Sequence, residues 1–198
     1  MKLVILTSST FFVEEDKILV TLFEEGLERL HLCKPSASPI YMERLLSLLP
    51  SNYYKKIFVH GHSYLKNEYG LGGVHVDDVI ADAAQLNSKV SCTCHSLGQL
   101  ATLKKQAGQV FLSSSFSNKA DGGGIGMAEL EQASQQGLID KRVFLAGAVN
   151  YDHIAWAKKL GFGGIAFQDE LWNQFDIHRH TDFKNLIDHF QKLRKAVG

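Results

Sequence analysis

The stretch Gly73-Val74-His75-Val76 decides between two folds for this chain. It belongs to a series of short apolar runs that recur roughly every 20–30 residues, as β-strands do when helices alternate with them. The other weak member of the series is Gly164-Ile165-Ala166-Phe167. The stronger runs are Lys2–Leu6, Glu28–Leu32, Lys56–His60, Lys89–Thr93, Gln109–Ser113 and Arg142–Ala146. If both weak runs are strands, the sequence contains eight strands.

Helical patterns lie between most of these runs. Residues 14–25 place apolar side chains at helical spacing. Further helices are expected around Tyr41–Leu49 and at Ser96–Ala107, Met127–Gln136, Asp152–Leu160 and Asp182–Ala196. Alternating strands and helices imply parallel strands joined by right-handed crossovers. We therefore expect an α/β protein, a compact (βα)8 TIM barrel forming one domain over residues 1–198. The alternative is a doubly wound sheet of five or six strands, with both weak runs as loops.

Composition narrows the class of protein. The chain has 198 residues, 45% hydrophobic, with 21 lysines and arginines balancing 21 aspartates and glutamates. A neutral chain has no overall field to attract a nucleic acid. Its apolar runs are shorter than the roughly 20 residues of a membrane span, and Leu3-Val4-Ile5-Leu6 is too short for a signal-peptide core, so we expect a cytoplasmic protein with no membrane partner. Cys33, Cys92 and Cys94 lack CxxC spacing, so reduced thiols are expected.

Histidines gather where the expected strands end. Five of the nine lie there: His31, His60, His62, His75 and His95. The carboxyl ends of the strands open on the face of a (βα)8 barrel that carries its chemistry, so this clustering predicts a functional site. For any single histidine the structural alternative is an imidazole bonded to a nearby backbone carbonyl.

Two kinds of chemistry fit these positions. His60-x-His62, beside His75 and His95 with Asp77 or Asp169 as an oxygen ligand, would suit a metal-dependent hydrolase. Anion binding is the other, because glycines let backbone N–H groups approach phosphate oxygens. Candidates are Gly122-Gly123-Gly124 after Lys119, Gly147, and Gly161-x-Gly163-Gly164. A loop without a ligand is the alternative for Gly122–Gly124.

Several short motifs carry a family resemblance. In chain order they are Leu30-His31-Leu32-Cys33-Lys34, Gly73-Val74-His75-Val76, Thr93-Cys94-His95-Ser96, Phe116-Ser117-Asn118-Lys119, Leu145-Ala146-Gly147-Ala148-Val149 and Gly161…Gly164-Ile165-Ala166. This ordered set resembles the thiamine phosphate synthase and thiazole tautomerase family of small (βα)8 barrels. The second motif is similar to the family's Gly-Val-His-Leu and the third to its Ser-x-His-Ser/Thr. The resemblance extends from the second strand to the eighth.

The resemblance implies an activity and a site. The family's synthase joins a pyrimidine methyl diphosphate to a thiazole phosphate and releases diphosphate, with Mg²⁺ and cationic groups on the leaving diphosphate. The catalytic positions carried over are His31, Cys33, Lys34, His60 and Thr93. The substrate and phosphate positions are His75, His95, Ser114, Lys119, Gly122, Gly123, Gly147, Ala148 and Asp169, and the Mg²⁺ positions are Asp77 and Asp78. A small phosphorylated thiazole or pyrimidine is the expected partner, and the sequence leaves room for a homo-oligomer.

The sequence departs from the synthase pattern at the diphosphate site. Cys33 occupies the place of an arginine, His60-Gly61 that of an Asn-Asp pair, and Asp169 that of a phosphate-side serine. The family's tautomerase needs acid–base groups and a phosphate grip but no diphosphate, although its histidine after strand six is Ser114 here. Three hypotheses follow: a synthase with an incomplete diphosphate and Mg²⁺ site, a tautomerase-like or non-catalytic paralogue that binds a thiazole or thiamine phosphate, and a metal-dependent hydrolase.

Overall fold

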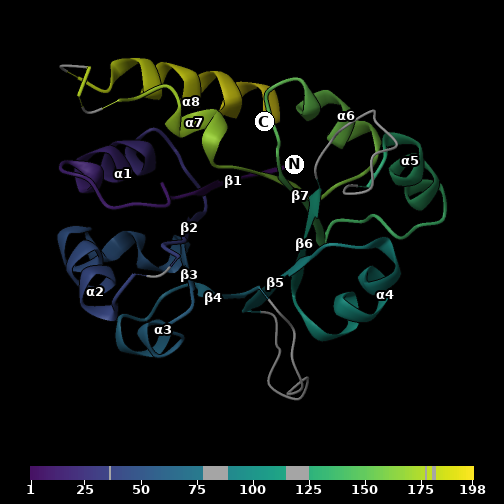
Figure 1. The fold of residues 1–198 in the computed structure, drawn as a ribbon, viewed down its shortest axis with the longest axis horizontal. Helices are drawn as coiled ribbons and strands as arrows, with labels where there is room; N and C mark the ends of the chain where they lie inside the picture. Colours follow the sequence, from purple (N-terminus) through teal and green to yellow (C-terminus); the bar gives the residue numbers. More distant parts are fainter. Residues whose placement is uncertain (36, 78–88, 115–124, 177, 180–181) are drawn as a thin grey trace. The chain divides into compact units, whose positions relative to one another are not determined.

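Strands are found at all eight predicted places. The computed structural model describes residues 1–35, 37–77, 89–114, 125–176, 178–179 and 182–198. The strands are β1 (Lys2–Leu6), β2 (Leu30–Leu32), β3 (Ile57–His60), β4 (Gly73–Val76), β5 (Val90–Cys94), β6 (Gln109–Ser114), β7 (Val143–Gly147) and β8 (Gly164–Phe167). They follow one another in chain order in a closed barrel (Figure 1). Both weak runs are strands, so the (βα)8 barrel is confirmed and the doubly wound alternative is wrong.

The chain divides into two compact units. The β1–β3 unit consists of Leu3–Val74 and Gln168–Gly198, and the β5–β8 unit consists of Met1–Lys2 and His75–Phe167. The boundary falls within β4, between Val74 and His75. A single domain over residues 1–198 stays a prediction.

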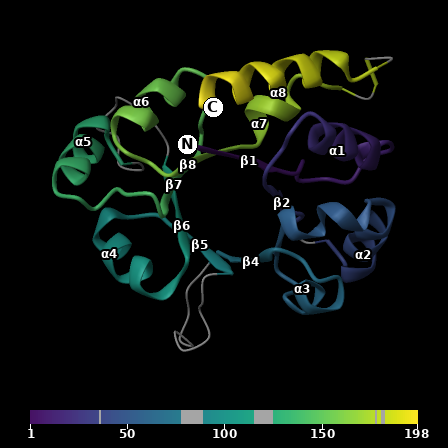
Figure 2. The same cartoon turned by 180° about the vertical axis from the view of Figure 1, so that it is seen from behind.

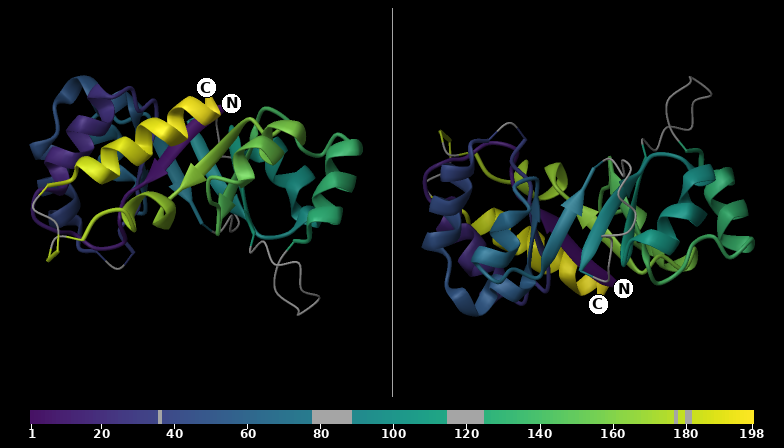
Figure 3. Two further views of the ribbon diagram at one scale, coloured as in Figure 1. Left: turned by 90° about the horizontal axis from the view of Figure 1, so that it is seen from above. Right: turned by 90° about the horizontal axis from the view of Figure 1, so that it is seen from below.

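In the β1–β3 unit, parallel strands carry helices that bury their apolar faces. Ile5 pairs with Leu30, and His31 pairs with Phe58. The helices are α1 (Glu15–Glu24), α2 (Pro39–Leu48), a 3-10 helix (Ser51–Lys56), α3 (Tyr64–Glu68), α7 (Asp169–Trp172) and α8 (Lys184–Val197). Four apolar residues of α1 recur at helical spacing and are buried, as the sequence predicts: Ile18, Leu19, Leu22 and Phe23. The last helix, α8, lies beside α7 and α1 (Figures 1 and 3).

In the β5–β8 unit, aromatic side chains on neighbouring strands set the packing. Phe111 of β6 pairs with Phe144 of β7, and their rings stack with centroids 5.1 Å apart. The first residue of β8 is Gly164, and no larger residue fits there, because a Cβ would lie 2.2 Å from the Phe144 ring. The helices are α4 (Leu97–Gln106), α5 (Met127–Gln135) and α6 (His153–Lys159), and α4 packs on β5 and β6 (Figure 2).

Two short helices, α3 and α7, are absent from the sequence prediction, whereas the predicted helix at Asp182–Ala196 is present as α8. No helix in the described part of the chain is both long and apolar enough to cross a membrane. The three cysteines are free thiols, as expected.

Candidate active site

Two histidines from neighbouring strands share a hydrogen bond in the β1–β3 unit. His31 lies opposite Phe58 in the register of β2 and β3, and His60 follows Phe58 by two residues, so His60 is on the same side of its strand as Phe58. The Nδ1 atom of His31 is 2.9 Å from the Nε2 atom of His60. We call these two residues the histidine pair. One proton lies between the two nitrogens, so a change of protonation at one ring acts directly on the other.

Packing holds the histidine pair in place. The ring of His31 stacks on Phe58 with the two planes 1° apart, and His60 meets His31 edge-on. The Arg29 guanidinium lies over the Phe58 ring, 4.3 Å from its centroid, and burial lowers its pKa. His31 is completely buried, whereas His60 is half-buried. His60 is therefore the more exposed member of the pair.

Lys34 forms a buried ion pair with Glu15. Its Nζ atom lies 2.5 Å from Oε1 of Glu15 and donates to the carbonyl of Thr10 at 2.8 Å. The same ammonium lies 4.6 Å from the centroid of the Phe11 ring. Both side chains of the ion pair are buried; burial raises the pKa of Glu15 to about 7 and lowers the pKa of Lys34. Lys34 thus ties the end of β2 to the segment that leads into α1.

Cys33 is held through its backbone. The buried Thr7 hydroxyl donates to the Cys33 carbonyl at 2.9 Å and accepts from the Cys33 N–H at 3.0 Å. The Gln168 side chain donates to the Thr7 carbonyl at 2.8 Å. The thiol of Cys33 is half-buried, and the predicted residue Asp169 is exposed at the start of α7.

A second polar cluster lies in the β5–β8 unit. His75 Nε2 is 2.8 Å from the Thr93 hydroxyl, and His75 Nδ1 is 2.9 Å from the Ser91 hydroxyl. The Thr93 hydroxyl donates to Oδ1 of Asp77 at 3.3 Å. We call these four residues the His75 network. Three of its members, His75, Thr93 and Asp77, are residues that the sequence singles out.

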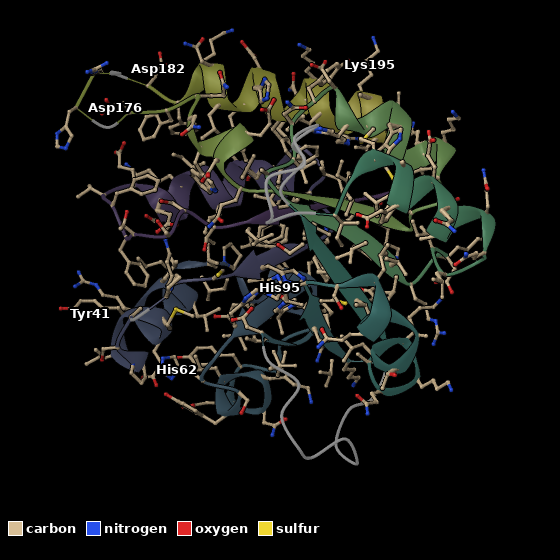
Figure 4. All side chains as sticks on the ribbon, turned by 45° about the vertical axis from the view of Figure 1, so that its right-hand side comes forward. Tyr41, His62, His95, Asp176, Asp182 and Lys195 are labelled. Atoms are coloured by element: carbon tan, nitrogen blue, oxygen red, sulfur yellow. The ribbon has the colours of Figure 1, made fainter. Side chains whose placement is uncertain are left out.

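The other predicted residues lie apart from these clusters. His62 Nε2 lies 3.1 Å from the Ala37 carbonyl, against the segment that leads into α2 (Figure 4). Among the described residues, no group of three potential metal ligands contains His62, so the geometry lends no support to a hydrolase centre at His60-x-His62. His95 is exposed directly after β5 (Figure 4).

The predicted phosphate grip is described in part. Gly147 and Ala148 are exposed after β7, and Gly147 has φ +97°, a left-handed conformation that glycine adopts without strain. The backbone of Ser114, the last residue of β6, pairs with Gly147. Asp78, Lys119, Gly122 and Gly123 lie outside the described residues.

The described residues do not fit a Mg²⁺ and diphosphate site. Mg²⁺ prefers oxygen ligands. Of the predicted metal positions, Asp77 alone is described, and its Oδ1 accepts from Thr93. At the place of the family's Asn-Asp pair, His60 offers an imidazole that is bonded to His31, and Gly61 offers no side chain.

Sequence reasoning missed several residues that shape these clusters: Thr7, Glu15, Arg29, Phe58 and Ser91. Ser91 could have been predicted from the sequence, because residues two apart in a strand share a face and Thr93 is a predicted site residue. Glu15 offered no such signal, because an acidic residue at the start of a helix is ordinarily exposed and interacts with the helix dipole.

Comparison with known proteins agrees with the barrel fold. The chain matches no family model and no curated protein. Among solved structures, thiamine phosphate pyrophosphorylase from Bacteroides thetaiotaomicron is 40% identical, with a TM-score of 0.88 over 99% of this chain and 97% of that one. Thiamine phosphate pyrophosphorylase from Pyrococcus furiosus is 19% identical, with a TM-score of 0.75 over 99% of this chain and 95% of that one.

A mutant tryptophan synthase alpha-subunit from Pyrococcus furiosus is 11% identical, with a TM-score of 0.67 over 99% of this chain and 97% of that one. At 19% and 11% identity, the two Pyrococcus structures support the barrel fold alone. The Bacteroides structure is similar in sequence over almost the whole of both chains. It confirms the resemblance seen in the strand-end motifs, and the chain belongs to the thiamine phosphate pyrophosphorylase family.

Proposed function

We propose that this chain is an acid–base enzyme that isomerises a thiazole phosphate, with the histidine pair as the proton-transferring group. The observation that carries the proposal is the 2.9 Å contact between His31 Nδ1 and His60 Nε2 at the ends of neighbouring strands. Imidazole is the side chain best suited to exchange protons near neutral pH. Two imidazoles that share a hydrogen bond can accept a proton at one ring and redistribute it to the other.

The proposed reaction moves one proton and leaves the composition of the substrate unchanged. His60, the half-buried member of the pair, takes a proton from one ring position of the thiazole, and the electrons of that bond shift the ring's double bonds. His31, which is fully buried, adjusts its hydrogen bond to the protonated His60. The pair then returns a proton to another position. Nothing is oxidised, and no group leaves.

The state of Lys34 supports isomerisation over diphosphate transfer. A departing diphosphate develops negative charge that needs cations free to pair with it. The Lys34 ammonium is already paired with the Glu15 carboxylate at 2.5 Å, in a contact that solvent does not reach. Breaking a buried pair leaves an uncompensated charge, which costs about 3–5 kcal/mol. Lys34 is therefore poorly placed to neutralise a leaving group.

The second candidate is synthase-type transfer, in which a pyrimidine methyl diphosphate joins a thiazole phosphate. The 40% identical structure named thiamine phosphate pyrophosphorylase favours it. This candidate requires Mg²⁺ and a cation other than Lys34. Among the predicted site residues, Lys119 has the positive charge that this role needs. A non-catalytic paralogue that binds the same phosphate would have the same predicted grip, at Lys119, Gly122, Gly123, Gly147 and Ala148.

Two reactions run side by side test the proposal. In one, purified protein receives the thiazole phosphate tautomer in buffer that contains a chelator; in the other, it receives the pyrimidine diphosphate, the thiazole phosphate and Mg²⁺. The proposal predicts isomerisation that the chelator does not affect and no thiamine phosphate. Formation of thiamine phosphate that stops on chelation would establish the synthase instead. Binding of the thiazole phosphate without either product would indicate the non-catalytic paralogue.

A further inference from the structure

The helix α2 carries apolar side chains on two opposite faces. Its inner face buries three of them, as an amphipathic helix does. On its outer face Ile40 is 67% exposed, Tyr41 is 56% exposed and Leu48 is 54% exposed. A helix that is apolar on both faces is ordinarily covered on both faces. The outer face of α2 therefore has the composition of a contact surface.

The exposed residues of α2 form a continuous row. Ile40, Arg44 and Leu48 follow one another at intervals of four residues, so they lie along one side of the helix. Tyr41 lies beside this row and points away from the strands in Figure 4, and the centroid of its ring is 5.9 Å from that of Phe11.

The helix α3 extends this face with one more aromatic side chain. Tyr64 is 45% exposed, and its hydroxyl donates to Oε1 of Glu43 at 2.6 Å. The contact joins the outer face of α2 to the first residue of α3. We call the combined set the α2 surface, and its members are Ile40, Tyr41, Glu43, Arg44, Leu48 and Tyr64.

The size of the α2 surface is that of one half of a small interface. From the exposed fractions and the areas of such side chains, it offers on the order of 500 Å². Monomeric proteins rarely leave a contiguous apolar patch larger than a few hundred Å² exposed. Two such surfaces placed together would bury about 1,000 Å², the lower limit for a specific interface.

The α2 surface is complementary to itself. A two-fold axis brings the same surface of two copies together, so that residue i contacts residue j and j contacts i. With the two α2 helices antiparallel and Arg44 at the axis, Ile40 of each copy lies opposite Leu48 of the other. Glu43 is adjacent to Arg44, so each guanidinium has a carboxylate of the other copy within reach, which offsets the repulsion between the two arginines. The chain has a net charge of zero, so two copies do not repel each other as a whole.

We propose that the α2 surface binds a second copy of this chain, with the two α2 helices antiparallel about a two-fold axis. The apolar ends of the helices form the contact, and the Glu43 and Arg44 side chains at the centre set the register. The inference goes beyond the isomerisation proposed above and does not depend on the histidine pair, because it concerns the association of two chains.

Sedimentation velocity of the full chain tests the association. As its concentration rises from about 1 µM to about 1 mM, the average mass should rise from that of one chain toward that of two, with half-association on the order of 10–100 µM, as suits an interface near the lower limit of size. The mass of one chain at every concentration would overturn the proposal. Growth beyond two chains would also overturn it, because a two-fold contact closes on itself.

Substitutions at the two ends of the row test the antiparallel pairing. Ile40→Glu and Leu48→Lys each place a charge against an apolar side chain of the other copy, so each alone should weaken the association at least about tenfold. The double variant Ile40→Glu/Leu48→Lys sets opposite charges against each other across the axis and should restore the association to within about threefold of the wild type. The two positions are about 12 Å apart along one helix, too far to pair within one chain.

The outcomes of these substitutions separate the contact from effects of net charge. Undiminished association in either single variant would overturn the proposal, and a double variant as weak as the single ones would overturn the antiparallel pairing. Ala101→Glu, at an exposed position of α4, is the matched control and should associate as the wild type does. Equal weakening in Ala101→Glu and Ile40→Glu would assign the loss to net charge and would also overturn the proposal. Circular dichroism and urea denaturation should show that all variants fold as the wild type does.

Discussion

Replacing Glu15 by Gln should change how stability depends on pH, because the Glu15 carboxyl is buried beside Lys34. Burial raises the pKa of Glu15 from 4.5 to about 7. Glutamine has nearly the same shape as a protonated glutamate and does not titrate. The difference in unfolding free energy between the wild type and Glu15→Gln therefore reports the ionisation of this one carboxyl.

The sign and size of the effect follow from the raised pKa. Below pH 4.5, Glu15 is protonated in the folded and unfolded states and contributes no pH dependence. Between pH 4.5 and about 7 the unfolded chain releases the proton and the folded protein keeps it, so rising pH favours unfolding. At about 1.4 kcal/mol per pKa unit, the wild type should lose on the order of 3 kcal/mol relative to Glu15→Gln across this interval. Above the folded pKa the difference is constant.

Urea denaturation from pH 4 to pH 8, followed by circular dichroism, measures this difference. Glu24→Gln, at an exposed position of the same helix, is the matched control and should follow the wild type within about 0.5 kcal/mol. A constant difference between wild type and Glu15→Gln over the whole interval would show that burial does not perturb this carboxyl. The assignment of a raised pKa to the buried Glu15 carboxyl would then be refuted.

Two further predictions concern packing and thiol reactivity. Gly164→Ala places a Cβ against the Phe144 ring and should lower the unfolding free energy, measured by urea denaturation, by about 1–3 kcal/mol. The control Gly98→Ala should not destabilise the protein, because its Cβ would meet nothing closer than 3.9 Å. Equal stabilities of the two variants would contradict this packing. Burial raises the pKa of Cys92 to about 12, so iodoacetamide at pH 8 should label the half-buried Cys33 before Cys92. Peptide mapping measures the two labelling rates, and equally fast labelling of Cys92 would contradict its burial.

The strands were predictable because a parallel barrel buries its strands on both faces. Such strands appear in a sequence as short apolar runs. Gly73–Val76 is a strand although it contains a histidine, because the buried His75 ring is hydrogen-bonded within the His75 network. The helices α3 and α7 could not be predicted in this way. They have five and four residues, too few to repeat an amphipathic pattern.

The candidate site was predictable as a place but not as an arrangement. Histidines at strand ends indicate a polar site, yet the bond between His31 and His60 depends on the register of β2 against β3. The sequence also suggests Lys34 as a cation for a ligand. Its pairing with Glu15 depends on the path of the segment between β1 and α1, and no local pattern specifies that path.

The most direct test of proton transfer through the histidine pair is the rate of thiazole phosphate isomerisation by the wild type and by His60→Gln, measured in metal-free buffer. Loss of a positioned general acid–base group costs about 10²–10⁴-fold in rate, so His60→Gln should be at least about 100-fold slower. His178→Gln, at an exposed histidine, is the matched control and should be as fast as the wild type. Equal rates for wild type and His60→Gln would contradict proton transfer through the histidine pair.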